Sequence, residues 1–187
     1  MTNLIVLSAP SGAGKTTVAR HILTEFPHCE FSVSATTRTM RSGEEHGKDY
    51  FFLTREDFIA KVDNGELVEY EEIFGNFYGT LRTQTDQRIS ENRVILFDVD
   101  VKGAVSLREA YPKESLLIYI APPDLEVLGE RLRARKTESE EQIKQRLSRA
   151  AMEMEYMRHF DHIIINDKLD VTLSKAHSIV EEALSEV

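Results

Sequence analysis

Short apolar runs alternate along this chain with longer stretches in which apolar residues recur every three or four positions. The runs at residues 4–7, 94–97 and 115–121 are short and largely apolar, which is typical of buried strands. Residues 17–26 instead carry their apolar side chains on one helical face. Continued along the chain, the pattern predicts strands at 4–7, 29–33, 49–53, 66–74, 94–97, 115–121 and 163–167, and helices at 17–26, 54–62, 83–91, 102–110, 125–135, 140–159 and 170–185.

This alternation predicts an α/β fold, in which helices flank a parallel sheet on both faces. Ligands then bind at the carboxyl ends of the strands. Residues 34–82 interrupt the alternation. Their first part, residues 34–50, is polar and rich in hydroxyl groups and glycine, and we expect no regular element there. The rest predicts two strands, a helix between them and a short return at 77–79, so we expect a small mixed β insertion in one compact unit of 187 residues.

The loop between the first strand and the first helix has the pattern of a phosphate-binding P-loop. Its backbone N–H groups and the helix dipole converge on one place, and Gly12 and Gly14 let the backbone curl around a phosphate. Lys15 brings a full charge to the outer phosphates, and the Thr16 hydroxyl can ligate Mg²⁺. Ala9 stands where the usual pattern has glycine, but this change removes no donor and no charge.

Two aspartates follow the apolar strand at 94–97. From the end of a strand beside a P-loop, Asp98 can reach the Mg²⁺ ion directly or through water. The alternative is that Asp98 caps the next helix. Asp100 lies nearer to the helix start, so the capping role suits Asp100 better.

Two groups of arginines are candidates for phosphate binding. Arg38 and Arg41 lie close together among hydroxyl groups, where they suit a phosphate held by bidentate contacts, although two solvated charges fit the spacing equally well. Arg131 and Arg135 share a helix face, and Arg146 follows about three turns later. These three suit a mobile lid, whereas the pattern alone favours a solvated helix with ion pairs.

Composition limits the partners and the compartment. The net charge of −9 argues against nucleic acid. No apolar run approaches the ~20 residues of a membrane span, and no secretory signal is visible, so we expect no membrane partner. A single cysteine, Cys29, excludes an internal disulfide and suits a reducing compartment. We therefore expect a cytoplasmic protein, either a monomer or a homodimer.

The order and spacing of these motifs resemble the bacterial guanylate kinases along essentially the whole chain. The residues that carry the resemblance are 9–16, 32–38, 41–44, 47–50, 74–79, 98–100, 121–123, 131–135 and 165–167. The resemblance implies a P-loop NTPase-type sheet that transfers the γ-phosphoryl group of ATP to GMP, with Mg²⁺ as cofactor. It divides the chain into a core (1–33, 83–123 and 154–187), a GMP-binding subdomain (34–82) and a helical lid (124–153).

The resemblance also assigns roles to individual residues. ATP binding falls to Ser11, Gly12, Ala13, Gly14, Lys15, Thr16, Thr17, Arg131 and Asn166. GMP binding falls to Arg38, Arg41, Tyr50 and Tyr78 for the phosphate, to Ser34, Glu69, Thr80 and Asp100 for the base, and to Asp98. The catalytic residues would be Lys15, Arg38, Arg135 and Arg146, and the metal ligand Thr16, with Asp98 directly or through water.

The base-reading set agrees with the chemistry of guanine. Guanine presents N1–H and N2–H₂ donors that a carboxylate such as Glu69 accepts, whereas adenine would leave this carboxylate unpaired. Two other functions stay open. One is a P-loop kinase for another small phosphate acceptor. The other is a non-catalytic module of guanylate-kinase shape that binds phosphopeptides, for which a damaged P-loop or lid is expected.

Overall fold

Five parallel strands form the central sheet of the computed structural model, which describes residues 2–73, 75–134 and 139–185. Their order across the sheet is β2-β7-β1-β8-β9. β1 lies between β7 and β8, and Leu4 pairs with Ile95 on one side and with Ser115 on the other. The strands are β1 (Leu4–Ser8), β2 (Cys29–Phe31), β7 (Val94–Asp98), β8 (Ser115–Ala121) and β9 (His162–Ile165).

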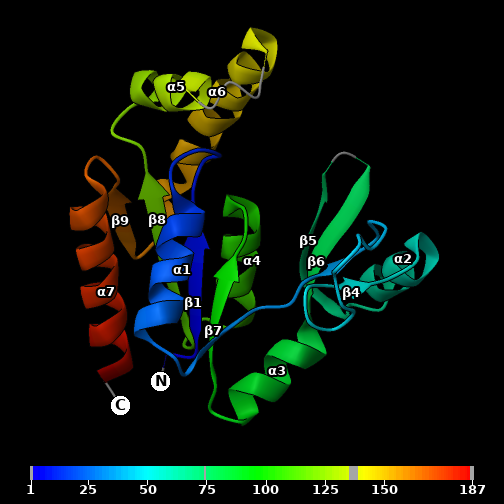
Figure 1. The fold of residues 1–187 in the computed structure, drawn as a ribbon. Helices are drawn as coiled ribbons and strands as arrows, with labels where there is room; N and C mark the ends of the chain where they lie inside the picture. Colours follow the sequence, from blue (N-terminus) through cyan, green and yellow to red (C-terminus); the bar gives the residue numbers. More distant parts are fainter. Residues whose placement is uncertain (1, 74, 135–138, 186–187) are drawn as a thin grey trace.

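Helices cover both faces of this sheet, as the sequence predicted (Figure 1). α1 (Lys15–Glu25) and α7 (Leu169–Ser185) pack on one face, against Ile5 and Leu7 among others. α4 (Val101–Ala110) packs on the other face, against Leu4 and Val6. Because successive residues of a strand point to opposite faces, a strand buried on both sides must be apolar throughout. This explains the continuous apolar run in β1.

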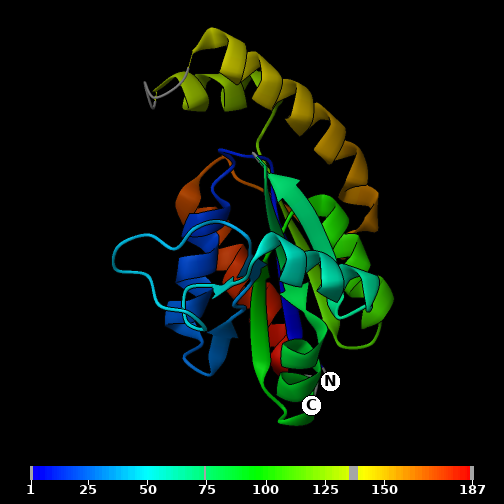
Figure 2. The same ribbon diagram turned by 90° about the vertical axis from the view of Figure 1, so that its right-hand side faces the viewer.

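A second, four-stranded sheet has the strand order β4-β3-β6-β5, and it lies beside the central sheet in Figure 1 and in front of it in Figure 2. We call it the mixed sheet. Phe58 is fully buried beneath it and stacks on Phe77, with ring centroids 5.3 Å apart. The elements of this part are β3 (Ala35–Thr36), β4 (Phe51–Phe52), α2 (Arg55–Asp63), β5 (Leu67–Ile73), β6 (Asn76–Leu81) and α3 (Arg82–Ser90), which leads back to the central sheet.

Two helices lie above the carboxyl ends of the central strands (Figure 1). They are α5 (Leu125–Ala134) and α6 (Glu140–Met154), and we call them the helix pair. A small core between them includes Leu128, Leu132 and Ile143. α6 begins at a capping box, in which Ser139 and Gln142 satisfy each other's backbone N–H groups. A 3₁₀ helix, η1 (Glu155–His159), continues the chain toward β9.

Several boundaries differ from the sequence predictions. The prediction of no regular element at 34–50 is wrong for Ala35–Thr36, because this pair forms β3 between β4 and β6. The strand that starts at Cys29 ends at Phe31. The helix predicted at 140–159 changes to 3₁₀ geometry after Met154. Within the described residues, no helix is both long enough and apolar enough to cross a membrane.

Candidate active site

The loop after β1 has the backbone geometry that a phosphate site requires. Gly12 and Gly14 adopt φ angles of 94° and 102°, in the left-handed region that disfavours a Cβ atom. α1 begins directly after this loop, at Lys15, two residues earlier than the sequence pattern predicted. The N–H groups at the start of this helix therefore adjoin the glycines, an arrangement that favours an anion at the helix N-terminus.

Lys15 joins the loop to the end of β7. Its ammonium group forms an ion pair with the Asp98 carboxylate and donates to the Val99 carbonyl oxygen at 3.0 Å. Asp98 does not cap the following helix. That role belongs to Asp100, whose Oδ1 accepts the Gly103 N–H at 2.8 Å, as the sequence suggested. Asp98 is therefore free to act at the P-loop.

Asn166, at the end of β9, is buried against the same loop. Its amide nitrogen donates to the Ala13 carbonyl oxygen at 2.7 Å, and its amide oxygen accepts the Thr172 hydroxyl at 3.0 Å. The Asn166 nitrogen would lie 2.4 Å from a Cβ atom on Gly14. The side chain thus fixes the loop from behind, and only glycine fits at the point of contact.

The helix pair reaches this loop through arginine side chains. Arg146 of α6 donates to the Ser11 hydroxyl at 2.7 Å. Arg131 of α5 lies within 3.4 Å of the Asp167 carbonyl oxygen, next to the end of β9. Arg135 lies outside the described residues. The ion-pair pattern that the sequence favoured for these helices is also present, since Arg133 contacts Glu140 at 3.1 Å.

Arg38, in the loop after β3, makes a bidentate contact with Glu44. The two nitrogen–oxygen distances are 3.0 and 2.7 Å. These hydrogen bonds raise the pKa of Arg38 and lower the pKa of Glu44, whose carboxylate also accepts the Arg41 backbone N–H. The Arg38 guanidinium lies 5.2 Å from the centroid of the Tyr50 ring. Glu44 thus occupies the donors that a phosphate would use.

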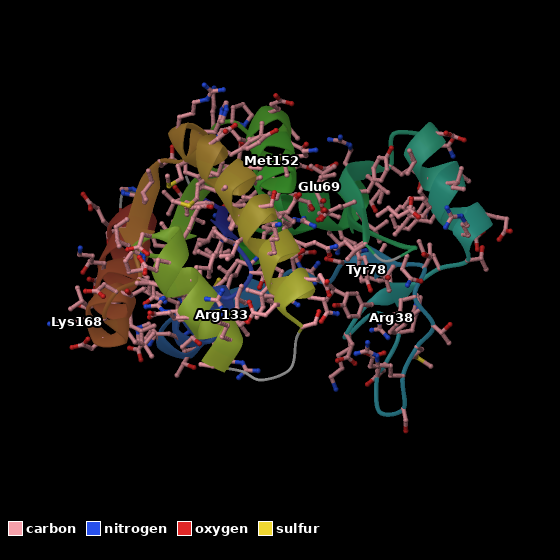
Figure 3. The ribbon with its side chains drawn as sticks, turned by 90° about the horizontal axis from the view of Figure 1, so that it is seen from above. Arg38, Glu69, Tyr78, Arg133, Met152 and Lys168 are labelled. Carbon is pink, nitrogen blue, oxygen red and sulfur yellow. The ribbon has the colours of Figure 1, made fainter. Side chains whose placement is uncertain are left out.

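A cavity of about 280 Å³ opens between the central sheet and the mixed sheet. Ser34, Tyr50 and Asp98 are among its lining residues, although they are far apart in the sequence. Tyr78 of β6 packs against one of these lining residues, since its ring centroid lies 6.1 Å from that of Tyr50. Figure 3 looks down on this region and shows Arg38 and Tyr78 on the side of the mixed sheet.

Glu69 and Asp100 form a second polar group at the start of α4. The Thr80 hydroxyl donates to Glu69 Oε1 at 2.6 Å. A Cβ atom on Gly103 would lie 3.1 Å from Glu69 Oε2 and 3.2 Å from Asp100 Oδ1, so both carboxylates converge on this glycine. Burial raises the pKa of Glu69 to about 7, and the negative charges of Asp100 and Glu71 act in the same direction.

Two oxygen donors lie where the P-loop predicts Mg²⁺. Thr16 is the second residue of α1 and is exposed, and the Asp98 carboxylate approaches from β7 beside Lys15. Hydroxyl and carboxylate oxygens suit Mg²⁺, which takes further ligands from phosphates and water. Among the described residues, no group of three or more His, Cys, Asp and Glu is arranged to hold a metal ion. The donor set fits an ion that binds together with a nucleotide.

Comparisons with known proteins identify the family. The sequence profile described as "Guanylate kinase" matches residues 1–183. The chain belongs to the guanylate kinase family. A guanylate kinase of Chlorobium luteolum is 50% identical over 89% of this chain and 85% of its own length. One from Chlorobaculum tepidum is 46% identical over 97% of this chain and 93% of its own length.

Solved structures support the same family. The crystal structure of guanylate kinase from Anaplasma phagocytophilum superposes with a TM-score of 0.73. Its sequence is 33% identical, and the match covers 97% of this chain and 86% of that chain. The fold, the family and the resemblance inferred from the motifs are thus confirmed.

Sequence reasoning missed three side chains at this guanylate kinase site. Glu44 was noticed only as part of a motif, yet it binds Arg38. Glu71 and Arg149 received no role, yet they form an ion pair at 2.7 Å between β5 and α6. The available signal was the position of Glu71, two residues after Glu69 on a strand, which places both side chains on one face.

Proposed function

We propose that this guanylate kinase family member transfers the γ-phosphoryl group of ATP to GMP, giving ADP and GDP, with Mg²⁺ as cofactor. The observation that carries the proposal is the position of two groups at one edge of the fold. The P-loop with Lys15 and Asp98 lies at the carboxyl end of the central sheet. Glu69, which accepts the Thr80 hydroxyl and suits guanine, converges with Asp100 on Gly103, just after the strand that ends at Asp98.

On the donor side, we propose that the P-loop holds the ATP phosphates. The residues would be Ser11, Gly12, Ala13, Gly14, Lys15, Thr16 and Thr17, with Arg131 and Asn166 toward the nucleoside. Mg²⁺, bound by Thr16 and by Asp98 directly or through water, would neutralise charge on the transferring group. The Arg146–Ser11 contact supports the proposal because it places a cation of α6 at the loop. Arg135 is proposed for the same purpose from the sequence alone.

On the acceptor side, we propose that Arg38, Arg41, Tyr50 and Tyr78 bind the GMP phosphate. The Glu44 carboxylate takes the place that we propose for the GMP phosphate, since it accepts hydrogen bonds from both terminal guanidinium nitrogens of Arg38. GMP would displace Glu44 and replace one anion by another. Ser34, Glu69, Thr80 and Asp100 would read the base: the Glu69 carboxylate accepts from N1–H and N2–H₂, and hydroxyl groups donate to O6. Asp98 belongs to both the proposed ATP side and the proposed GMP side, because it contacts Lys15 of the P-loop and also lines the cavity.

The reaction needs positioning and charge neutralisation more than proton transfer. The second pKa of a phosphate monoester is ~6, so the acceptor is already an anionic nucleophile at neutral pH. Lys15, Arg38 and Arg146 would hold two polyanions in line and stabilise the transferring group. Exclusion of water by a closing lid would suppress hydrolysis of ATP.

We propose the domain division on the same basis. The core is 1–33, 83–123 and 154–187, the GMP-binding subdomain is 34–82, and the lid is 124–153. The mixed sheet supports the second assignment, because it carries Glu69, Tyr78 and Thr80. The helix pair supports the assignment of 124–153 as the lid, because Arg146 of α6 contacts Ser11 of the P-loop. We also propose a monomer or homodimer in the cytoplasm, with no nucleic-acid or membrane partner.

The two alternative functions are not favoured. A non-catalytic module that binds phosphopeptides needs neither Lys15 nor a lid arginine, yet Lys15 contacts Asp98 and Arg146 contacts Ser11. A P-loop kinase for another acceptor does not require a half-buried carboxylate paired with a hydroxyl, whereas Glu69 and Thr80 form such a pair and suit the donors of guanine. The relatives described above are named guanylate kinases.

The test is ADP release with ATP, Mg²⁺ and one acceptor at a time: GMP, AMP, CMP, UMP or a ribose phosphate. We expect turnover with GMP to exceed that with the others by on the order of 100-fold or more, since a carboxylate that accepts the guanine donors would be left unpaired by adenine. Lys15→Met should abolish turnover. Equal turnover with AMP would refute the guanine assignment, and folded protein without turnover would favour the binding module.

A further inference from the structure

Four carboxylates and one guanidinium gather where α6 crosses the mixed sheet and the start of α4. Arg149 of α6 contacts Glu71 at 2.7 Å and Glu153 at 2.7 Å, and it lies 3.9 Å from Asp100. Glu69 completes the group from β5. Figure 3 shows Glu69 at the border between α6 and the mixed sheet. One cation therefore bridges three secondary-structure elements.

The carboxylates of this group influence one another. Glu69 and Asp100 converge on Gly103, and Glu71 lies on the same strand face as Glu69. Burial holds the pKa of Glu69 at about 7, and the charges of Asp100 and Glu71 contribute to that rise. A side chain with this pKa is only half ionised at neutral pH. A change in the charges of its neighbours therefore shifts the balance between carboxylate and carboxylic acid.

Other groups face Glu69 from the elements packed around it. β6 supplies the neutral Thr80 hydroxyl, which donates to Glu69. α4 supplies Asp100, and Lys102 lines an adjoining cavity of about 440 Å³ together with Glu71, Asp100 and Arg149. α6 supplies Arg149 and Glu153. The side chain of Glu153 is 9% exposed, and burial raises its pKa despite the Arg149 contact.

Arg149 is placed to link this group to the other half of the site. It follows Arg146 by three residues, so the two side chains leave neighbouring positions on α6. Arg146 reaches the P-loop at Ser11, while Arg149 reaches Glu71 and Asp100. One helix thus sends a guanidinium to the proposed donor site and another to the proposed acceptor site.

We propose that Arg149 is a positioning residue for guanine recognition, which neutralises Glu71 and Asp100 so that Glu69 meets the base as a carboxylate. This inference rests on the proposed GMP site. Without Arg149, two negative charges beside Glu69 would lose their counter-charge, and protonated Glu69 would be favoured. A carboxylic acid cannot accept both guanine donors, because one of its oxygens carries a proton.

The first experiment measures the charge of Glu69 without any substrate. The full chain is labelled with ¹³C at the glutamate carboxyl carbons, and Glu69 is assigned from the signal that disappears in Glu69→Gln. We expect a titration midpoint near 7 in the parent protein and a midpoint about one pH unit higher in Arg149→Met. Arg133→Met is the matched control, since it removes a lid arginine that pairs only with Glu140 among the described ion pairs.

The second experiment measures KM for GMP between pH 6 and 9. In Arg149→Met we expect KM at pH 7 to rise about fivefold, which is the change in ionised fraction when a midpoint moves from 7 to 8. The difference should disappear near pH 9, while kcat and KM for ATP stay unchanged. Arg149→Lys keeps the positive charge, so its KM for GMP should stay close to that of the parent protein. Adding Glu71→Gln to Arg149→Met should return KM for GMP toward the parent value.

Two results would overturn the inference. One is an unchanged Glu69 midpoint in Arg149→Met. The other is a KM increase of equal size at every pH, which would indicate that Arg149 only orients the lid. The failure of the proposed function has a different signature, because the parent protein would then show no turnover with GMP. The carboxyl titration would still report in that case whether Arg149 sets the charge of Glu69.

Discussion

Replacing Glu69 by glutamine should make the protein more stable and less active at the same time. Glu69 has a pKa of about 7 instead of its ordinary value of 4.5, because burial disfavours the charged form. Its ionisation therefore opposes folding. The penalty is absent below pH 4.5, where both folded and unfolded states hold the proton, and it grows until the pH has passed 7.

The size of the stability gain follows from that difference. At 1.36 kcal/mol for each pKa unit, ionisation of Glu69 lowers the free energy of unfolding above pH 8 by at most about 3 kcal/mol. The actual loss is smaller, because solvent still reaches part of the side chain. Glutamine keeps an oxygen for the Thr80 hydroxyl, which lies 2.6 Å away in the parent protein. With that ceiling reduced to about 2 kcal/mol, we expect a melting temperature about 4–8 °C higher at pH 8, since 1 kcal/mol corresponds to about 2–4 °C for a chain of this size. The gain should vanish as the pH falls toward 4.5.

The loss of activity follows from the same substitution. Glutamine replaces an acceptor facing guanine by an N–H₂ donor, so one charge-assisted hydrogen bond is lost and two donors oppose each other. Together these changes remove about 3 kcal/mol of transition-state stabilisation, so kcat/KM for GMP should fall on the order of 100-fold. Glu72→Gln is the matched control, because Glu72 lies on the same strand, is exposed and contacts Arg55 at 3.8 Å.

Melting curves of the three proteins from pH 4.5 to 8.5, with GMP kinetics on the same samples, provide the assay. A Glu69→Gln protein that is no more stable than its parent at pH 8 would refute the burial reasoning. An unchanged kcat/KM for GMP would refute the role of Glu69 in reading the base.

Three other substitutions test the geometry. Gly14→Ala should reduce kcat/KM for ATP on the order of 100-fold in steady-state assays, because its φ is 102° and a Cβ would lie 2.4 Å from Asn166 Nδ2. Thr172→Val should lower the free energy of unfolding by about 1–3 kcal/mol in urea titrations, since it leaves buried Asn166 Oδ1 without the Thr172 hydroxyl. Gly103→Ala should raise KM for GMP about tenfold while KM for ATP stays constant, because its Cβ would lie 3.1 Å from Glu69 Oε2. Unchanged values in these assays would contradict each expectation in turn.

The P-loop was predictable because its chemistry is local. Gly12, Gly14 and Lys15 lie within four consecutive positions between an apolar strand and a helix, so their arrangement depends on short-range backbone geometry. The capping role of Asp100 was predictable for the same reason, since it accepts a hydrogen bond from an N–H three residues away. Local rules missed the strand at Ala35–Thr36, where long-range pairing with β6 made a strand of a polar segment.

The contacts of charged side chains were not predictable in this way. Arg38 was a candidate phosphate ligand, but nothing in its spacing showed that Glu44 would occupy its guanidinium. Asn166 was expected only as one of the ATP-binding residues, and its contact with the Ala13 carbonyl oxygen joins residues 153 positions apart. Contacts of this kind depend on which strands become neighbours, and that depends on the packing of the whole sheet.

The amino-acid sequence alone was sufficient for the fold class and the family, because apolar periodicity and consecutive motifs are local properties that can be recognised without the tertiary structure. The tertiary structure alone decided the electrostatics. The pKa of Glu69 near 7 comes from its burial and from Asp100 and Glu71, and Arg149 meets Glu71 across 78 positions of chain. Burial and the distance between charges set these energies, and both exist only after helices and sheets have packed together.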